Sequence, residues 1–489
     1  MVTIAGPLVL MAVLLVAVSP GFALSDRAAA DRIYKEALQL IEKRQADQAI
    51  ATLREAIALD PDHPGAHFQL GFLLGTRGRL EEAAGELQVS LRLTPDHGPS
   101  HYYLGAAYWF MGNFRAAIDS LQSAVRLMPD HPQANYYLGL AFRKTGQADQ
   151  AVRYLRKSTS LDQNNSEAFH ALGLALQETF ELDAAVTALK RAVELKPDFT
   201  QARNDLGLAL VRKRDPDGAI AAFREVLKYD SRNIAAHHNL GMALIQKGDF
   251  AQAVDVYRVL VALYPDNGEA RYNLGLALKN QDQLDAAVAE LRKAVELRPS
   301  LAQANYTLGV ILLQQSKLDE AASSFRAAIA NKADYAEARY ALGTVLQQRG
   351  KLDEAIEAFE EALKYSPDAP EIHNTLGNAY RQKGKREAAQ KHFGEAARLN
   401  KKKSNIQAAV FALNTGLARL REGNLDAAIE RFQAAIKLDS ENPEAYFHLA
   451  TALEQSGLKD EANQAREKGA ELQRSRNISG SGPAGRILY

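Results

Sequence analysis

Residues 98–131 read GPSHYYLGAAYWFMGNFRAAIDSLQSAVRLMPDH, and the 34 residues that follow them repeat the same pattern. Leu-Gly stands at positions 104–105 and again at 138–139. In both directions from this pair, Leu-Gly recurs every 34 residues, from Leu70 to Leu376. A fixed period of this length is typical of a chain built from stacked structural repeats.

The unit occurs thirteen times. Eleven copies follow one another without a gap over residues 30–403, five residues then intervene at 404–408, and two more copies occupy 409–473. The sequence leaves open whether 404–408 forms a hinge or a longer loop. Residues 24–29 are expected to be a linker before the first copy, and the Gly/Ser-rich residues 474–489 a disordered tail.

Positions within a copy are numbered 1–34, beginning at Ala30 in the first copy. Position 8 is Gly in eleven copies, position 20 is Ala in all thirteen, and position 24 is large and apolar in all but the last, which has Arg466. Positions 4, 7, 8 and 11 form one stripe of a helix, and positions 17, 20, 24 and 27 form a second. Because Gly in a helix costs ~1 kcal/mol relative to Ala, position 8 is expected where two backbones approach closely, with the Ala of position 20 opposite.

Glycine and proline mark the ends of the two predicted helices. Gly at position 15 can end the first helix in a left-handed conformation; it occurs, among other copies, at Gly78, Gly112, Gly146, Gly248, Gly350 and Gly384. Pro at position 32, present in seven copies, ends the second helix. Proline also suits the first turn of the next helix, as at Pro64, Pro132, Pro370 and Pro443.

The complete pattern resembles the tetratricopeptide repeat: a period of 34, Leu-Gly at positions 7–8, Ala at 20, an aromatic residue or Leu at 24 and Pro at 32. The resemblance covers residues 30–473. It implies an all-α fold, a right-handed superhelical solenoid of antiparallel helix pairs. The first helices would line a concave groove that binds proteins or peptides. The largely polar second helix of the last copy fits a solubilising cap.

The N-terminus differs in composition from the repeats. Residues 2–24 carry no charge, and an apolar run from Leu8 to Val18 is followed by a small-x-small pattern at 21–23. This predicts a signal peptide over residues 1–23, cleaved after Ala23, and hence an exported protein that is periplasmic or secreted. No Lys or Arg precedes the apolar run. The alternative is an uncleaved membrane anchor formed by residues 2–24, which approaches the ~20 residues that span a bilayer.

Composition excludes several classes of function. Lys+Arg and Asp+Glu both number 59, so no net charge exists to attract nucleic acid, and no nucleic-acid partner is expected. The chain has no Cys, which removes disulfides and thiolate chemistry. No phosphate-binding, nucleophile-elbow or metalloprotease motif is present. We therefore expect neither an enzyme nor a cofactor.

Two pairs of histidines have the four-residue spacing that can chelate a metal on a helix. They are His63 with His67, and His97 with His101. Because the second pair is the first pair displaced by one repeat, duplication alone explains them. We expect these histidines to be structural and expect no metal site.

The resemblance also predicts which residues face the groove. Positions 2, 5, 6, 9, 12 and 13 of the first helices face the concave side in this family. The candidates at these positions are Phe68, Tyr102, Tyr103, Trp109, Phe110, Tyr136, Tyr137, Asn239, Tyr272, Asn273, Tyr306, Tyr340 and Asn374. Aromatic side chains contribute much of the energy at interfaces, and Asn amides can bond a peptide backbone. We interpret copies 2 to 4 as an aromatic binding surface; the alternative is that the rings pack against neighbouring first helices.

Charge is uneven in the eleventh copy, which has nine Lys/Arg and three Glu. Arg381, Lys383, Lys385 and Arg386 belong to this basic set. They are either a solvated surface or a docking patch for an acidic partner or an anionic surface. Some tetratricopeptide domains clamp a C-terminal carboxylate with Lys and Asn, but position 5 is never Lys here, so that use is not expected.

These features together predict a non-catalytic scaffold that presents a groove to peptide or protein partners, in the assembly of an envelope complex. The alternative is a substrate-recognition or adaptor subunit that works with a separate transferase or secretion machine. Self-association is a third reading. The membrane would be contacted only through the N-terminal anchor, if there is one.

Overall fold

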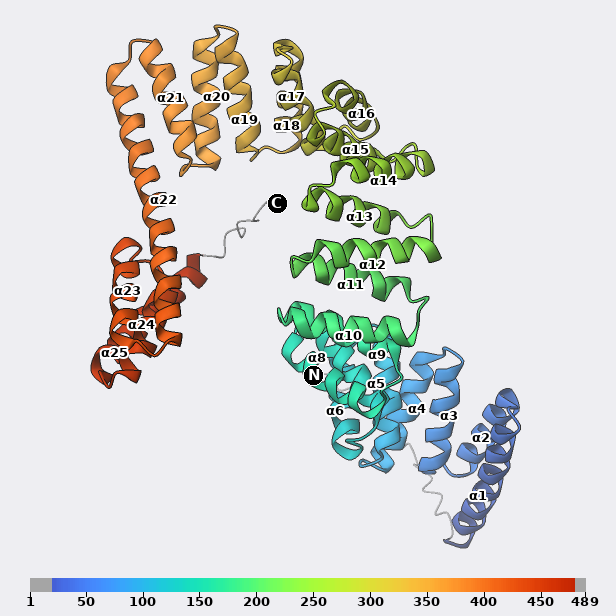
Figure 1. Ribbon diagram of the computed structural model, residues 1–489. Coiled ribbons are helices and arrows are strands. Elements are labelled where there is room, and N and C mark those ends of the chain that lie inside the picture. The colour runs from blue at the N-terminus through green and yellow to red at the C-terminus, as the bar shows by residue number, and fades with distance from the viewer. Residues whose placement is uncertain (1–19, 480–489) are drawn as a thin grey trace, which may run out of the picture. The chain divides into compact units, whose positions relative to one another are not determined.

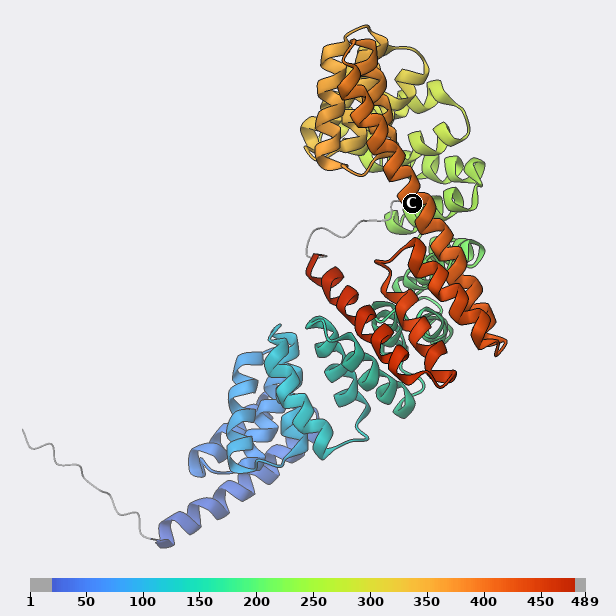
Figure 2. The same cartoon turned by 90° about the vertical axis from the view of Figure 1, so that its left-hand side faces the viewer.

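A computed structural model describes residues 20–479, which form 25 helices and no strand. The chain divides into two compact units, one ending at Tyr264 and the other beginning at Pro265 (Figures 1 and 2). Most of the predicted signal or anchor, residues 1–19, lies outside the described residues. Over residues 20–479, no helix is both long enough and apolar enough to cross a membrane.

The helices follow the predicted repeat. The first unit contains α1 Pro20–Glu42, α2 Ala46–Leu59, α3 Pro64–Thr76, α4 Leu80–Leu93, α5 Gly98–Phe110, α6 Phe114–Leu127, α7 Pro132–Lys144, α8 Ala148–Leu161, α9 Ser166–Glu178, α10 Leu182–Leu195, α11 Thr200–Arg212, α12 Pro216–Tyr229, α13 Ile234–Lys247 and α14 Phe250–Leu263. The second contains α15 Gly268–Asn280, α16 Leu284–Leu297, α17 Ala302–Gln314, α18 Leu318–Asn331, α19 Ala336–Gln348, α20 Leu352–Tyr365, α21 Pro370–Gln382, α22 Arg386–Arg421, α23 Leu425–Leu438, α24 Pro443–Gln455 and α25 Lys459–Ser479. The prediction of an all-α solenoid of helix pairs is confirmed.

The Gly at position 8 is required by the side chain at position 24 of the same copy. A Cβ added to Gly105 would lie 2.5 Å from Cγ of Leu121 and 3.2 Å from its backbone nitrogen. The expected opposite residue, the Ala of position 20, contributes less: a Cβ on Gly71 would lie 3.1 Å from the carbonyl oxygen of Ala83. The close approach is therefore between the backbone at position 8 and the large side chain at position 24. Our prediction that the Ala of position 20 is the main partner is corrected accordingly.

The turn between the paired helices has one conformation throughout. Position 15 has a positive φ in all thirteen copies of the described chain, and eight of these residues are Gly. The other five are Arg44, Phe180, Arg214, Asp282 and Ser316, with φ between 59° and 61°. The prediction that this position ends the first helix in a left-handed conformation is confirmed.

The entry into each first helix is fixed by side-chain hydrogen bonds. His63, His97 and His131 each accept a hydrogen bond at the N-cap from the backbone N–H three residues later. Position 4 then bonds back to the turn: Nε2 of His67 lies 2.9 Å from the carbonyl oxygen of Pro61, and Arg271 donates similarly to Pro265. The histidine pairs thus have structural contacts at both positions.

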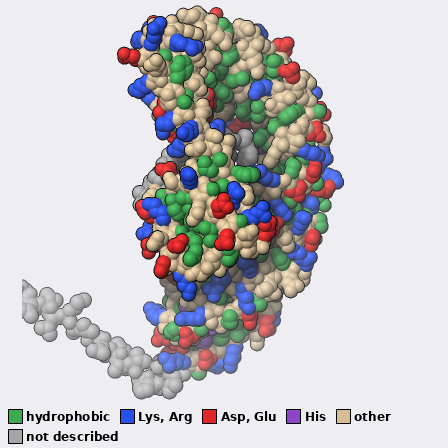
Figure 3. Space-filling view, turned by 60° about the vertical axis from the view of Figure 1, so that its left-hand side comes forward, with side chains coloured by type: hydrophobic (Ala, Val, Ile, Leu, Met, Phe, Trp, Pro, Cys, Tyr) green, Lys and Arg blue, Asp and Glu red, His purple; other side chains and the backbone are tan. Residues whose placement is uncertain are grey.

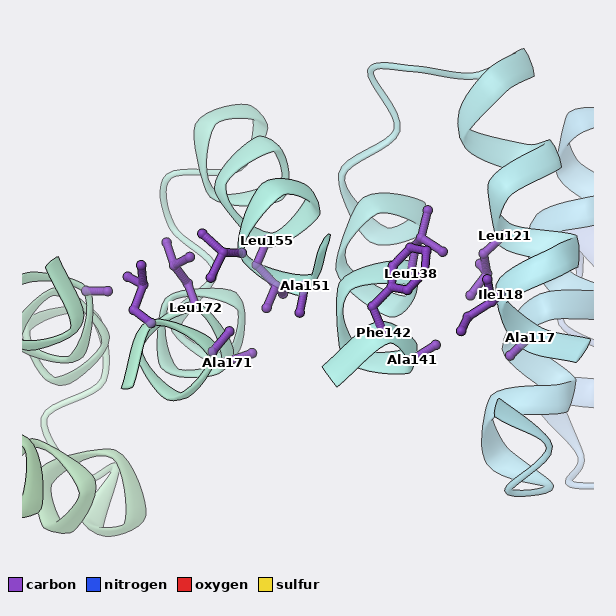
Figure 4. Packing of buried hydrophobic residues seen from close by; sticks show 14 of the residues in the cluster. Ala117, Ile118, Leu121, Leu138, Ala141, Phe142, Ala151, Leu155, Ala171 and Leu172 are labelled. Atoms are coloured by element: carbon purple, nitrogen blue, oxygen red, sulfur yellow. The ribbon is translucent and has the colours of Figure 1, made fainter. Parts of the chain in front are cut away.

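Apolar side chains form a core that continues from copy to copy. Figure 4 shows Leu121 of α6, Leu138 and Phe142 of α7, Leu155 of α8 and Leu172 of α9 following one another in one buried cluster. Successive first helices also pack together, α3 on α5, α5 on α7 and α7 on α9 in the first unit. The surface formed by first-helix positions 2, 5, 6, 9, 12 and 13 is called the first-helix face below.

Residues 404–408 are helical and do not form a loop. They continue α22, which joins the second helix of the eleventh copy to the first helix of the twelfth in 36 residues (Figure 1). Lys401 occupies position 32, where seven copies have Pro, and no Gly or Pro occurs between Gly394 and Gly416. No proline therefore obstructs the helix here, but α8, α12 and α18 end without Pro at position 32, so this feature permits a continuous α22 and does not by itself explain it.

Both predicted terminal segments are partly helical. Residues 24–29, expected as a linker, belong to α1, and residues 474–479, expected as part of a disordered tail, belong to α25. The first Gly after the last copy's helix is Gly480, and Oγ of Ser475 donates to the carbonyl oxygen of Glu471. The helix therefore continues to the residue before Gly480; residues 480–489 lie outside the described residues.

Candidate functional site

On the first-helix face, side chains of successive copies are linked to one another. Position 5 of one copy meets position 6 of the next: Nε2 of His170 lies 2.7 Å from Oδ2 of Asp205. Nδ2 of Asn239 donates to Oδ1 of Asn204 at 3.0 Å, and the hydroxyls of Tyr340 and Thr375 are 3.1 Å apart. These predicted groove residues therefore also hold neighbouring repeats together.

Copies 2 to 4 differ because aromatic rings replace these polar pairs. The ring centroid of Tyr103 lies 4.8 Å from those of both Phe72 and Tyr102. Tyr102 lies 6.4 Å from Tyr137, which in turn is 5.9 Å from Phe110. The rings of α3, α5 and α7 form one continuous cluster, and ring contacts between neighbouring first helices, such as Tyr102 with Tyr137, are what the alternative of packed rings predicts.

The cluster encloses a pocket of about 220 Å³, which we call the aromatic pocket. The side chains that line it include Phe72, Tyr102, Tyr103, Phe110 and Tyr137. Phe110 is 63% exposed at its mouth, whereas the three tyrosines are half-buried. A pocket of this kind, apolar with a few hydroxyl groups, is suited to one side chain of a bound peptide.

Two small residues create the space. Gly75 occupies position 12, where the next copy has Trp109, and a Cβ at Gly75 would meet only Ala83, at 3.7 Å. Ala106 occupies position 9, where the neighbouring copies have Phe72 and Leu140. Phe72, Gly75 and Ala106 were not among the groove residues predicted from the sequence. The signal that could have found them is a small residue at a groove position flanked by large ones.

Trp109 and Tyr136 lie beside the pocket but do not line it. The ring centroid of Trp109 lies 5.0 Å from that of Phe114 and 6.4 Å from that of Tyr137. Tyr136 packs on Tyr137 at 5.3 Å. These two rings support the wall of the pocket from behind, while Phe68 contacts its edge through Tyr103, at 6.0 Å.

The hydroxyl groups of the cluster remain protonated at neutral pH. Burial raises the pKa of Tyr102, with smaller contributions from Tyr137 and Tyr103. Burial, followed by the neighbouring Tyr137 and Glu167, raises the pKa of Tyr136 to about 12. The rings therefore offer neutral hydroxyls that can both donate and accept hydrogen bonds.

The candidates in the second unit are more dispersed. Tyr272 bonds to Thr307, Asn273 is buried, and Tyr306 packs on Tyr335 at 5.1 Å. Asn374 is exposed on α21. The described residues of this unit contain no aromatic cluster comparable to that of copies 2 to 4.

The four basic candidates lie together at the turn between α21 and α22, and all are exposed. Lys383 forms an ion pair with Asp353. The guanidinium of Arg381 lies 5.7 Å from the ring of Phe393, and Nζ of Lys385 lies 5.7 Å from that of Tyr380. On the face seen in Figure 3, basic and acidic side chains are intermixed.

Profiles of known protein families match the repeats described above. A tetratricopeptide repeat profile matches residues 102–166, 170–235, 204–268, 238–302, 272–336 and 306–370, which together exceed half of the chain. The chain belongs to the tetratricopeptide repeat family. A second tetratricopeptide profile matches 40–108 and 346–411, and a third matches 416–457. Tetratricopeptide proteins are in general non-catalytic, and the chain is accordingly a protein-interaction scaffold.

Solved tetratricopeptide structures are similar to parts of the chain. YrrB, described as having an unusual peptide-binding site, is 22% identical, with 38% of this chain and 96% of YrrB covered and a TM-score of 0.36. MamA is 32% identical, with 34% of this chain and 96% of MamA covered and a TM-score of 0.33. PilF of Pseudomonas aeruginosa is 18% identical, with 44% and 97% covered and a TM-score of 0.38. Among curated proteins none matches this chain.

Proposed function

We propose that the first-helix face of copies 2 to 4 binds an extended segment of a partner protein, with one large apolar side chain of that segment in the aromatic pocket. The observation that carries the proposal is the pocket itself, about 220 Å³ between five aromatic rings. Rings bury much area at little entropic cost. Because they already contact one another, little ordering is needed on binding.

The tyrosine hydroxyls would give the site its polar specificity. Tyr102, Tyr103 and Tyr137 line the pocket with protonated hydroxyl groups. Such groups can bond the backbone on either side of the anchored side chain. An apolar anchor within a segment that also supplies backbone donors and acceptors is therefore the expected ligand.

A pocket-filling substitution tests this proposal. Gly75→Leu places a side chain in the space, and the 3.7 Å distance from the added Cβ to Ala83 predicts no clash with the backbone. Gly85→Leu is the matched control, because Gly85 lies exposed on α4 with nothing within 4 Å of an added Cβ. Peptides are selected against the full chain from a random library, and their affinities are measured by calorimetry.

We expect Gly75→Leu to weaken the selected peptides at least tenfold and Gly85→Leu to leave their affinity unchanged. The chain's single tryptophan, Trp109, lies 6.4 Å from Tyr137, so its fluorescence should change on binding. Equal affinity for the two variants would place the peptide elsewhere and overturn the proposal.

We further propose that the scaffold acts after export, in the assembly of an envelope complex, with residues 1–23 as a cleaved signal or residues 2–24 as an anchor. The uncharged apolar run supports this. An adaptor that presents substrates to a separate transferase or secretion machine is the second candidate. N-terminal sequencing of the mature protein tests export: a start at Leu24 supports cleavage, and an intact N-terminus in the cytoplasmic fraction contradicts export.

A further inference from the structure

The continuous helix α22 leaves one repeat face uncovered. At the other joints, position 3 of a first helix is buried against the preceding copy; it is Ala or Ser at each of these joints except that of the eleventh copy, where it is Ile372, 4% exposed. Ala66, Ala134, Ala168, Ala202, Ala236, Ala304, Ala338 and Ala445 at this position are fully buried. In the twelfth copy the same position is Phe411, which is 75% exposed. Val410, next to it in the sequence, and Ile406, one helical turn before Val410, are 46% and 39% exposed.

The eleventh copy is not built to cover this face. Positions 17 and 21, which are apolar in eleven copies, are Arg386 and Gln390 in the eleventh. The only other copy with polar residues at both positions is the last, with Lys459 and Asn463. The eleventh copy therefore has the polar outer surface of a terminal cap. At these positions it offers no apolar surface against which the exposed apolar residues of the twelfth copy could pack.

Basic side chains border the uncovered face. Lys401, Lys402 and Lys403 precede Ile406 on the same helix, all three are exposed, and none forms an ion pair with another described residue. Over its whole length α22 has eight Lys/Arg and two Glu. Figure 2 shows this helix running on alone between α21 and α23.

A groove of about 800 Å³ lies along this part of α22. Leu399, Lys402, Lys403, Ile406 and Gln407 form one wall, and the turn and first residues of α21, 366–371, form the other. Leu399, Ile406 and Val410 recur at helical spacing, so the apolar wall of the groove leads to Val410, and Phe411 lies next to this stripe, about 100° further round the helix. The result is an apolar stripe with a basic border.

We propose that this surface, residues 399–411 of α22, docks an amphipathic helix of another protein that carries acidic residues beside its apolar stripe. A helix fits because a helix covers the corresponding face at the regular joints. Acidic residues fit because the unpaired Lys402 and Lys403 line the groove beside the stripe. A second copy of this chain is disfavoured, since pairing two α22 helices would bring together two segments that each have a net charge of +6. The site is separate from the aromatic pocket and does not depend on it.

The test uses the full chain and two designed 20-residue peptides. Both have the same leucine stripe; one has Glu and the other has Lys on its flanks. Fluorescence anisotropy measures their binding to the wild type, to Phe411→Ser and to the triple variant K401E/K402E/K403E. Val259→Ser is the matched control, because Val259 is 48% exposed on α14. Phe411 is so exposed that its replacement should leave the fold intact, which circular dichroism checks.

We expect the acidic peptide to bind, to lose at least tenfold in affinity with Phe411→Ser, and to lose its salt dependence with the triple lysine variant. Val259→Ser should bind as the wild type does. The proposal is overturned if the basic peptide binds equally well, if neither peptide binds, or if Phe411→Ser changes nothing. Sedimentation and flotation with phosphatidylglycerol vesicles complete the test: a dimer or a vesicle complex abolished by Phe411→Ser would assign the face to self-association or to a lipid surface instead.

Discussion

At the scale of single residues, position 8 and position 24 of each copy share one space. In the eleven copies with Gly at position 8, the large side chain at position 24 lies directly over this backbone, so an added Cβ would have to displace it, as the 2.5 Å between a Cβ on Gly105 and Cγ of Leu121 shows; the first and last copies accommodate Ala37 and Ala450. The sequence predicts that position 8 needs a close approach, because Gly is otherwise unfavourable in a helix. The sequence does not reveal that position 24 supplies the contacting side chain, because the Ala at position 20 is at least as constant as the Gly at position 8.

Gly105→Ala is predicted to destabilise the chain by about 2 kcal/mol, because overpacking of a well-packed core costs ~1–3 kcal/mol. Gly85→Ala is the control: an added Cβ meets nothing within 4 Å, so the better helix propensity of Ala should stabilise by up to ~1 kcal/mol. Denaturant unfolding followed by circular dichroism measures both. A neutral Gly105→Ala would contradict the packing described.

Acidification should destabilise the fold through its histidines. Burial lowers the pKa of His97, His131 and His392; for His392 the nearby His373 and Lys391 add to this. The unfolded chain therefore takes up protons below pH ~6.5 that the folded chain resists, and stability falls as the pH decreases from there. His67 acts in the opposite sense: burial lowers its pKa, but hydrogen bonds to Glu86 and Pro61 outweigh burial and leave it raised.

With three lowered histidines against one raised, the midpoint of thermal unfolding should be lower at pH 5.5 than at pH 7.5. His392→Gln should reduce the difference. Scanning calorimetry at both pH values measures it, and a midpoint that rises at pH 5.5 would show that the sign is wrong.

At the scale of elements, local sequence predicts most helix ends. The positive φ at Gly78 and its counterparts and the proline at the start of α3 follow directly from residue type. The sequence fails to predict α22 because the five inserted residues suggest an interruption. Lys401 in place of Pro permits the helix to continue, but Gln163, Ser231 and Ala333 also replace this Pro where a helix ends, so residue type alone does not predict α22. The aromatic pocket is also not predicted. Its space exists because Gly75 and Ala106 are small, and a small residue on its own gives no obvious signal in the sequence.

Asn405→Pro tests whether α22 joins two separately capped stacks. Pro within a helix costs ~3 kcal/mol or more, so amide hydrogens near residues 400–410 should lose protection in hydrogen exchange. Because the eleventh copy has a cap-like outer surface, the amides of α19 to α21 should keep their protection. Loss of protection that spreads into α21 would mean that the copies on both sides of α22 unfold together.

At the scale of the whole molecule, thirteen similar pairs differ mainly on their first-helix face. Most copies there have polar links such as His170 to Asp205, which tie the stack together. Copies 2 to 4 have the aromatic pocket instead. A repeat pattern that is nearly constant predicts the fold well, since each pair contacts chiefly its neighbours. The binding site depends on the few residues that depart from the pattern.

The most direct measurement of the central claim is a crystal structure of the full chain with a library-selected peptide. We expect one apolar peptide side chain between Phe72, Tyr103 and Tyr137, with the adjoining peptide backbone hydrogen-bonded to tyrosine hydroxyls. A peptide bound to the second helices α4, α6 and α8, with the aromatic pocket empty, would contradict it.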